Sequence, residues 1–401
     1  MQRLSIRPMR PVRSPVRVLA VAGALGCLAG AAQAQSTIEL FGVAYDVTRL
    51  DYSTIEFDNP FFPGFSLVLF EVEGTHYLPG ADALVMTTDQ LGDQSGPSNA
   101  LVQVGLVRDG DGRVVDIRFD RVIRFVDEFQ DFDLNVSGVT VNTGDQGLGA
   151  GGNLVVSSGN ERLYGFDLAT GALQETTPGC VGEGCGIAID PPNSDCEDVA
   201  YIPTRNELYT VRQEDASLYG IVRFDPQGNP LGEFPVGAAA NPAVPGEPKG
   251  VTYLPQGGAS PFASEAIIVC MDDQGPGLHA FDLDGNELGY EPLTDAAGNP
   301  LLDADGFVLQ LESLAYDPAT GTLFLTNQGD AFTQNFLWVL QPAAGTPCRA
   351  DIDGDGSLTL FDFLGFQNLF DAGDLRADFD GDGSLTLFDF LTFQNEFDAG
   401  C

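Results

Sequence analysis

Lysine is almost absent from this chain of 401 residues and occurs only at Lys249. Arginine and lysine together number 18, against 58 aspartates and glutamates, so the formal net charge is −40. A surface this acidic repels phosphate backbones and anionic lipid headgroups. The shortage of basic residues therefore argues against nucleic acids and anionic membranes as partners.

Histidine is nearly as scarce, with only His76 and His279 available as bases at neutral pH. The sequence also lacks a Gly-x-Ser-x-Gly motif and a His-Glu-x-x-His motif, which are local signatures of serine hydrolases and zinc peptidases. A serine-histidine-aspartate triad is therefore disfavoured.

Long apolar runs are missing beyond the N-terminus. Residues 1–34 contain five arginines, an apolar run from Val18 to Ala32, and the small-residue sequence Ala32-Gln33-Ala34. This is the pattern of a secretory signal peptide, and its removal would lower the formal charge from −40 to −45. No later segment approaches the roughly 18 apolar residues that span a bilayer. We expect no membrane span and a protein that is secreted or attached to the cell surface.

Six of the seven cysteines follow residue 34, an even number typical of disulfides in exported proteins. The sequence does not determine how the following four cysteines pair, and a zinc site formed by all four is the alternative to disulfides: Cys180, Cys185, Cys196 and Cys270. Cys348 and Cys401 bracket the C-terminal segment, and a bridge between them would contribute about 4 kcal/mol in the chain-entropy model.

The C-terminal segment consists of two nearly identical copies of one sequence. Residues 350–373 and 377–400 are identical at 21 of 24 positions. Oxygen-bearing side chains occupy positions 1, 3, 5, 7, 9 and 12 of each copy, namely Asp351, Asp353, Asp355, Ser357, Thr359 and Asp362, then Asp378, Asp380, Asp382, Ser384, Thr386 and Asp389. This spacing is that of an EF-hand calcium loop, with Gly356 and Gly383 at the sharp turn of position 6. The repeat therefore predicts two Ca²⁺ ions.

A helical pattern follows each loop. Leu360, Phe363, Leu364, Phe366 and Phe370 recur mostly at steps of three and four residues, and the second copy repeats them. Two such helices packed together would bury these side chains, which neither helix could do alone. Phe361 and Phe388 lie off the apolar stripe and are the candidates for an exposed contact.

These residues resemble the dockerin family, in the Cys-bracketed form found at the C-termini of exported bacterial proteins. The resemblance covers about the last 54 residues, although position 12 is Asp where an EF-hand usually has Glu. It implies two calcium ions and attachment to a cohesin-like protein. It also implies that Leu360, Phe361, Leu387 and Phe388, at the helix starts, would face that partner.

The long middle of the chain is rich in short alternating runs broken by Gly, Pro, Asn and Asp, which indicates an all-β structure. A short motif ending in Tyr-x-Pro, which we call the phrase, recurs at residues 73–79, 197–203, 249–255 and 312–318, and a weaker copy begins at Gly138. Each is followed by a turn and further strands, several ending in Phe-Asp. Units of four short strands must stack radially to bury their faces, as β-propeller blades do.

We therefore predict a signal peptide over residues 1–34, a β-propeller of five or six blades over 35–345, and a small all-α calcium-binding module over 346–401. The N-terminal strand either closes the ring or belongs to a sixth blade. Paired β-sandwiches are the rival architecture. The phrases weakly resemble exported phytase-like and SdiA-regulated propellers, a similarity that implies the fold more firmly than an activity.

Four charged residues would occupy equivalent places around the central channel if each phrase opens an innermost strand: Glu73, Glu197, Lys249 and Glu312. Three converging carboxylates repel unless they share a proton, a cation or Lys249. A divalent ion there would suit hydrolysis of a phosphoester or lactone. Glu73, Glu197, Glu312 and His76 are thus the candidate catalytic residues. The alternative is that they only solvate a channel, so that the protein acts as a binding module.

Overall fold

The structure is a computed structural model that describes residues 36–52, 56–58, 66–69, 72–87, 100–125, 136–158, 162–176, 178, 180, 182–189, 196–213, 216–257, 259–272, 275–295, 298–302, 308–327, 335–343, 350, 352, 358–372, 375–377, 379 and 385–399. Short antiparallel strands dominate residues 36–343, as the alternating patterns predict. The two long helices of the described residues lie in the duplicated segment.

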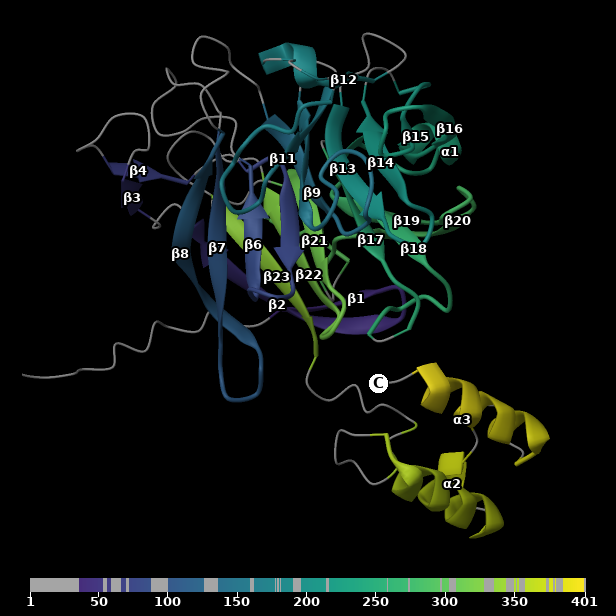
Figure 1. The fold of residues 1–401 in the computed structure, drawn as a ribbon. Helices are drawn as coiled ribbons and strands as arrows, with labels where there is room; N and C mark the ends of the chain where they lie inside the picture. Colours follow the sequence, from purple (N-terminus) through teal and green to yellow (C-terminus); the bar gives the residue numbers. More distant parts are fainter. Residues whose placement is uncertain are drawn as a thin grey trace, which may run out of the picture. The chain divides into compact units, whose positions relative to one another are not determined.

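Five antiparallel sheets stand in a ring and form a five-bladed β-propeller (Figure 1). Blade one contains β5 (Thr75–Leu78), β6 (Ala83–Met86), β7 (Ala100–Arg108) and β8 (Val114–Arg124). Blade two contains β9 (Val136–Asn142), β10 (Asn153–Ser158), β11 (Arg162–Phe166) and β12 (Ile187–Ala188). Blade three contains β13 (Cys196–Ile202), β14 (Glu207–Arg212), β15 (Gly220–Phe224) and β16 (Pro230–Pro235). Blade four contains β17 (Glu247–Leu254), β18 (Ala266–Asp272), β19 (Gly277–Asp282) and β20 (Glu287–Pro292).

The fifth blade joins the two ends of the propeller. Its strand order is β21 (Leu311–Asp317), β22 (Thr322–Asn327), β23 (Phe336–Pro342), β2 (Val43–Asp51) and β1 (Ser36–Leu40). The N-terminal strand β2 pairs with β23 from Tyr45↔Pro342 to Asp51↔Phe336. The N-terminal segment therefore closes the ring, which decides between the two predicted roles and gives five blades.

Smaller elements decorate this ring. They are the hairpin β3 (Glu56–Asp58) and β4 (Ser66–Val68), the 3-10 turn η2 (Gly182–Cys185) and the short helix α1 (Gly237–Ala240). Cys180 and Cys185 form a disulfide, so two members of the open group pair with each other. Cys196 and Cys270 are buried within β13 and β18.

The innermost strand of each blade carries the repeated phrase. Neighbouring inner strands β5, β9, β13, β17 and β21 contact one another around the ring. Apolar clusters fill the space between adjacent blades, for example around Leu254 and Leu314 between blades four and five. The Phe-Asp endings also have a physical cause: Phe166, Phe224 and Phe281 are buried, while each following Asp accepts backbone N–H groups in a turn.

Ion pairs reinforce the contact between blades five and one. Arg108 Nη2 lies 2.7 Å from Asp82 and 3.0 Å from Asp317, whose side chain is only 1% exposed. Arg113 Nη2 lies 2.9 Å from Asp46 on β2. These pairs join the closing blade to its neighbour, in addition to the chain that leads from β2 to β5.

The duplicated segment folds as α2 (Leu360–Ala372), the 3-10 turn η3 (Leu375–Ala377) and α3 (Leu387–Ala399). Phe366 and Phe393, which occupy the same position in the two copies, stack with ring centroids 4.2 Å apart. Phe363 and its counterpart Phe390 meet edge to face at 6.1 Å. Contacts between equivalent residues are the mark of twofold symmetry, so the repeat in sequence is a repeat in space. No helix in the described ranges is long and apolar enough to cross a membrane.

Candidate functional site

The strand registers place five residues at one level of the channel. Each inner strand except β5 carries a bulge where its phrase begins, and β5 starts just after it. The aligned residues, which we call the mouth ring, are Glu73, Ser137, Glu197, Lys249 and Glu312. The strand pairing shows the predicted equivalence for Glu197, Lys249 and Glu312, and Glu73 directly precedes β5 in the same alignment. Ser137 completes the ring from blade two.

Lys249 supplies the positive charge of the mouth ring. Its Nζ lies 3.5 Å from Glu197 Oε1 and 4.0 Å from Glu312 Oε2. It also donates to Gln213 Oε1 at 3.2 Å, and Gln213 in turn donates to Glu247. Burial alone would lower the pKa of Lys249, but the nearby carboxylates, chiefly Glu312 and Glu197, raise it above its ordinary value. The ammonium therefore stays charged and is no nucleophile at neutral pH.

A second level, which we call the axial ring, follows one residue further along: Gly74, Gly138, Asp198, Gly250 and Ser313. The inner strands approach most closely here. A Cβ on Gly138 would lie 2.5 Å from the Asp198 Cα, and one on Gly250 would lie 2.7 Å from the Ser313 Cα. Each position thus points at the next blade's backbone, which explains the glycines of the repeated phrase.

Asp198 is the exception in the axial ring, because it carries a long polar side chain that is 1% exposed. Its Oδ2 accepts the Val251 N–H of the next blade at 3.0 Å, and its Oδ1 accepts the Val199 N–H at 2.8 Å. The Val139 N–H of blade two also bonds to it. Burial raises the pKa of Asp198 well above its usual value, and the three amides act in the opposite sense.

A small cavity of about 50 Å³ lies along the inner strands beyond the axial ring and is lined by residues of all five blades. His76 lines it, three positions beyond Glu73, and its Nδ1 is 3.5 Å from Thr140 Oγ1. Desolvation lowers the pKa of His76 to about 4. The imidazole is therefore neutral at pH 7 and a weak base. No hydrogen bond or ion pair joins it to the three glutamates in the part of the chain that the structure describes.

Acidic residues also follow or end the second strand of three blades. Two of them, Asp89 and Asp215, lie outside the described residues. Asp272 ends β18 and adds to the field that raises the pKa of Lys249. Within the described ranges, no group of three or more His, Cys, Asp or Glu side chains is arranged to hold a metal ion. Between Glu197 and Glu312 the positive charge comes from Lys249.

Most predicted calcium ligands lie outside the described residues: Asp351, Asp353, Asp355, Ser357, Asp378, Asp380, Asp382 and Ser384. The last two of each loop are described. Thr359 and Thr386 cap their helices, and their hydroxyls accept the N–H of Phe361 and Phe388. The carboxylates of Asp362 and Asp389 accept the backbone N–H of these threonines at 2.8 and 2.6 Å.

These two carboxylates fit a bound cation. Asp362 and Asp389 are fully buried, and burying a carboxylate is costly unless a positive charge compensates it. Oxygen ligands of this kind suit a hard cation such as Ca²⁺.

The starts of both helices expose the same apolar side chains. Phe361 is 70% exposed and Phe388 is 67% exposed, as their position off the stripe predicted. Leu360 and Leu364 are 69% and 43% exposed, so their assignment to the buried stripe was wrong. The side chains that pack between the two helices are instead Phe363, Phe366 and their counterparts.

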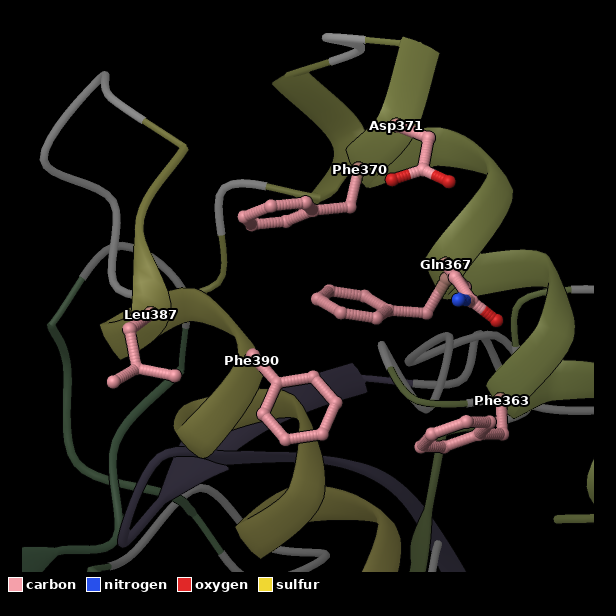
Figure 2. A pocket seen from close by; sticks show the side chains of 7 residues that line it. Phe363, Gln367, Phe370, Asp371, Leu387 and Phe390 are labelled. Atoms are coloured by element: carbon pink, nitrogen blue, oxygen red, sulfur yellow. The ribbon is translucent and has the colours of Figure 1, made fainter.

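An apolar pocket lies between the two helices (Figure 2). Phe363, Gln367, Phe370 and Asp371 line it from α2, and Leu387 and Phe390 line it from α3. Its volume is about 390 Å³, enough for one large side chain of a partner. The pocket adjoins the exposed Leu387.

Asp198 is the residue that sequence reasoning missed. The signal was present, because alignment of the five phrases places Asp198 where the other blades have glycine or serine. Lys249 was found because it breaks the glutamate pattern in the same alignment. Gln213, which accepts a hydrogen bond from Lys249, gave no such signal, since it lies beyond the end of β14.

Comparisons with known proteins add little to this picture. No protein-family model and no curated protein matches the sequence. Among solved structures, Raptor of Chaetomium thermophilum has a TM-score of 0.36 and 11% identity, covering 77% of this chain and 30% of that one. A luciferin-regenerating enzyme has a TM-score of 0.35 and 12% identity, covering 69% of this chain and 92% of that one. The chain thus spans less than a third of Raptor's length.

Proposed function

We propose that this chain is an exported β-propeller protein attached to a protein partner by its C-terminal, calcium-binding, dockerin-like module. One observation carries the proposal: the two helices expose the same Leu-Phe pair at their starts, Leu360-Phe361 and Leu387-Phe388. Exposed apolar side chains gathered in this way are typical of protein interaction surfaces. The dockerin resemblance assigns these positions to the partner contact.

Calcium would order the surface in this proposal. In each copy the buried carboxylate, Asp362 or Asp389, belongs both to the predicted calcium loop and to the first turn of the helix that presents the Leu-Phe pair. A cation held by the loop would therefore fix the start of that helix. Binding of the partner should then depend on calcium.

The test compares the full chain with a Phe361→Ser, Phe388→Ser double variant. Calorimetry should give two calcium sites for both proteins, because neither phenylalanine is a ligand. Binding to a panel of cohesin modules, measured by surface plasmon resonance, should require calcium and weaken at least about 10-fold in the double variant. The absence of calcium binding at millimolar concentration would refute the proposal. Equal binding of both proteins to every cohesin module would also count against it.

A second candidate function rests on the mouth ring, where Glu197 and Glu312 converge on Lys249. Such a site could act in metal-dependent hydrolysis of phosphoesters or lactones, with the tail serving only for localisation. A divalent ion would then bind beside or in place of the Lys249 ammonium. The assay uses the full chain and a Glu312→Gln variant on both substrate classes, with and without divalent ions. Activity lost in the variant would support this function, and inactivity throughout would leave the binding role.

A further inference from the structure

The axial ring holds an arrangement that the proposed function does not use. In a propeller each inner strand pairs on one side only, so the other edge directs peptide N–H and C=O groups toward the channel. Such groups need partners when they are buried. The N–H groups of Val139, Val199 and Val251 come from three adjacent blades and meet on one carboxylate.

We propose that these three amides form an anion-binding site on the propeller axis, for which the Asp198 carboxylate is the built-in ligand. Converging backbone N–H groups are a recurrent means of binding anions in proteins. No lysine or arginine forms a hydrogen bond or ion pair with Asp198 among the described residues. The hydrogen-bond partners of this carboxyl group are therefore peptide N–H groups.

The room for this side chain comes from Gly138 of the neighbouring blade. Asp198 Oδ1 lies 2.3 Å from where a Cβ on Gly138 would stand, so an alanine there would displace the carboxylate. On the other side, the Val251 N–H of blade four binds Oδ2. The glycine of blade two thus leaves the space that the carboxylate of blade three fills.

The carboxylate also divides the channel. It bonds to three of the five inner strands between the mouth ring and the cavity that His76 lines. Any ligand of the mouth ring would meet Asp198 before reaching that cavity. The site thus fastens blades two, three and four together and closes the axis below Lys249.

The test removes the ligand and supplies it again. Replacing Asp198 by glycine, the residue of three other blades, deletes a group equivalent to acetate. The full-length Asp198→Gly variant should melt roughly 5 °C or more below the natural protein, because three buried N–H groups lose their acceptor. Sodium acetate, but not sodium chloride at equal ionic strength, should restore part of this loss in a saturable way.

Ser313→Gly is the matched control, because it trims the same ring in blade five without removing a carboxylate. The proposal fails if acetate raises the melting temperature of Asp198→Gly no more than that of Ser313→Gly. It also fails if Asp198→Gly has the same melting temperature as the natural protein. Should Asp198→Gly not fold, Asp198→Asn decides: its amide group offers one acceptor fewer, so it should melt below the natural protein, and equal or higher melting overturns the proposal.

Discussion

Single residues at the propeller axis carry constraints that their size alone does not suggest. Gly138 has no unusual φ angle. A Cβ at this position would nevertheless lie only 2.3 Å from Asp198 Oδ1 and 2.5 Å from Ser157 Oγ, which is too close for a carbon atom. The constraint is therefore close approach of two strands, and not backbone conformation. Glycine at this level permits five strands to meet in one ring.

We predict that Gly138→Ala destabilises the propeller by roughly 2–3 kcal/mol, the upper range for overpacking in a core. Gly110→Ala is the control, since nothing lies within 4 Å of a Cβ at that position and its change should be about 0.5 kcal/mol or less. Denaturant unfolding followed by the fluorescence of Trp338, the only tryptophan, measures both. Similar losses in the two variants would disprove the close-packing argument.

His76 makes a prediction about pH. Its pKa is about 4 in the folded chain, below the ordinary value of 6.5, so the unfolded chain takes up the proton first as pH falls. The contribution of His76 is thus intact above pH 6.5 and is lost between 6.5 and about 4, by up to roughly 3 kcal/mol. His76→Thr, which copies Thr140 and Thr252 of other blades, should weaken this loss. An unchanged difference in unfolding free energy between pH 7 and pH 4.5 would contradict it.

Among elements, the strands were the most predictable part of the chain. The Tyr-x-Pro phrase recurs because each inner strand has the same surroundings, so one alignment located four strands and indicated the fifth. The closing role of β2 could not be chosen in advance, because Tyr45 and its neighbours suit any outer strand. Only the pairing with β23 distinguishes five blades from six.

The helices were less predictable in detail. Spacing alone assigned Leu360 and Leu364 to the buried face, whereas both are exposed. Two helices of 13 residues have room between them for few large side chains, and Phe366 and Phe393 take the centre. The helical periodicity predicts which apolar side chains could be buried, but the small size of the module limits how many of them are.

The mouth ring gives a prediction at the level of its strands. Lys249→Met should destabilise the propeller by roughly 3 kcal/mol, because Glu312 on β21 and Glu197 on β13 would keep their charges without a cation. The double variant Lys249→Met, Glu312→Gln should regain part of that loss, and Glu312→Gln alone supplies the third corner of the cycle. Additive effects in denaturant unfolding would show that the pair does not couple. Recovery of Lys249→Met by a divalent ion would favour the metal-dependent candidate.

At the scale of the whole molecule, charge is the dominant property. With 58 acidic and 18 basic residues, cations are scarce, and Arg108 and Lys249 each lie near two carboxylates. In the propeller, the buried Asp317 and Glu312 lie near Arg108 and Lys249, and Asp198 accepts peptide N–H groups. In the duplicated segment, Asp362 and Asp389 are buried, and the proposed Ca²⁺ ions would place positive charge beside them.

The two parts should therefore respond differently to removal of calcium. Helices α2 and α3 contain most of the helical residues that the structure describes, so circular dichroism at 222 nm reports on the C-terminal module, while Trp338 reports on the propeller. With calcium at about 1,000 times its dissociation constant, each site would stabilise the module by about 4 kcal/mol. A chelator should then lower the helical transition by well over 10 °C and leave the Trp338 transition within about 2 °C.

Asp362→Asn with Asp389→Asn is the matched variant for this experiment, because asparagine keeps an acceptor for the Thr359 and Thr386 N–H groups but removes the charge. It should resemble the chelated protein even in calcium, since a hard cation loses one carboxylate in each loop. If chelation moves neither transition, the buried aspartates owe their stability to something other than calcium. If it moves both equally, the propeller contains a calcium site of its own, and the mouth ring becomes the first place to search for it.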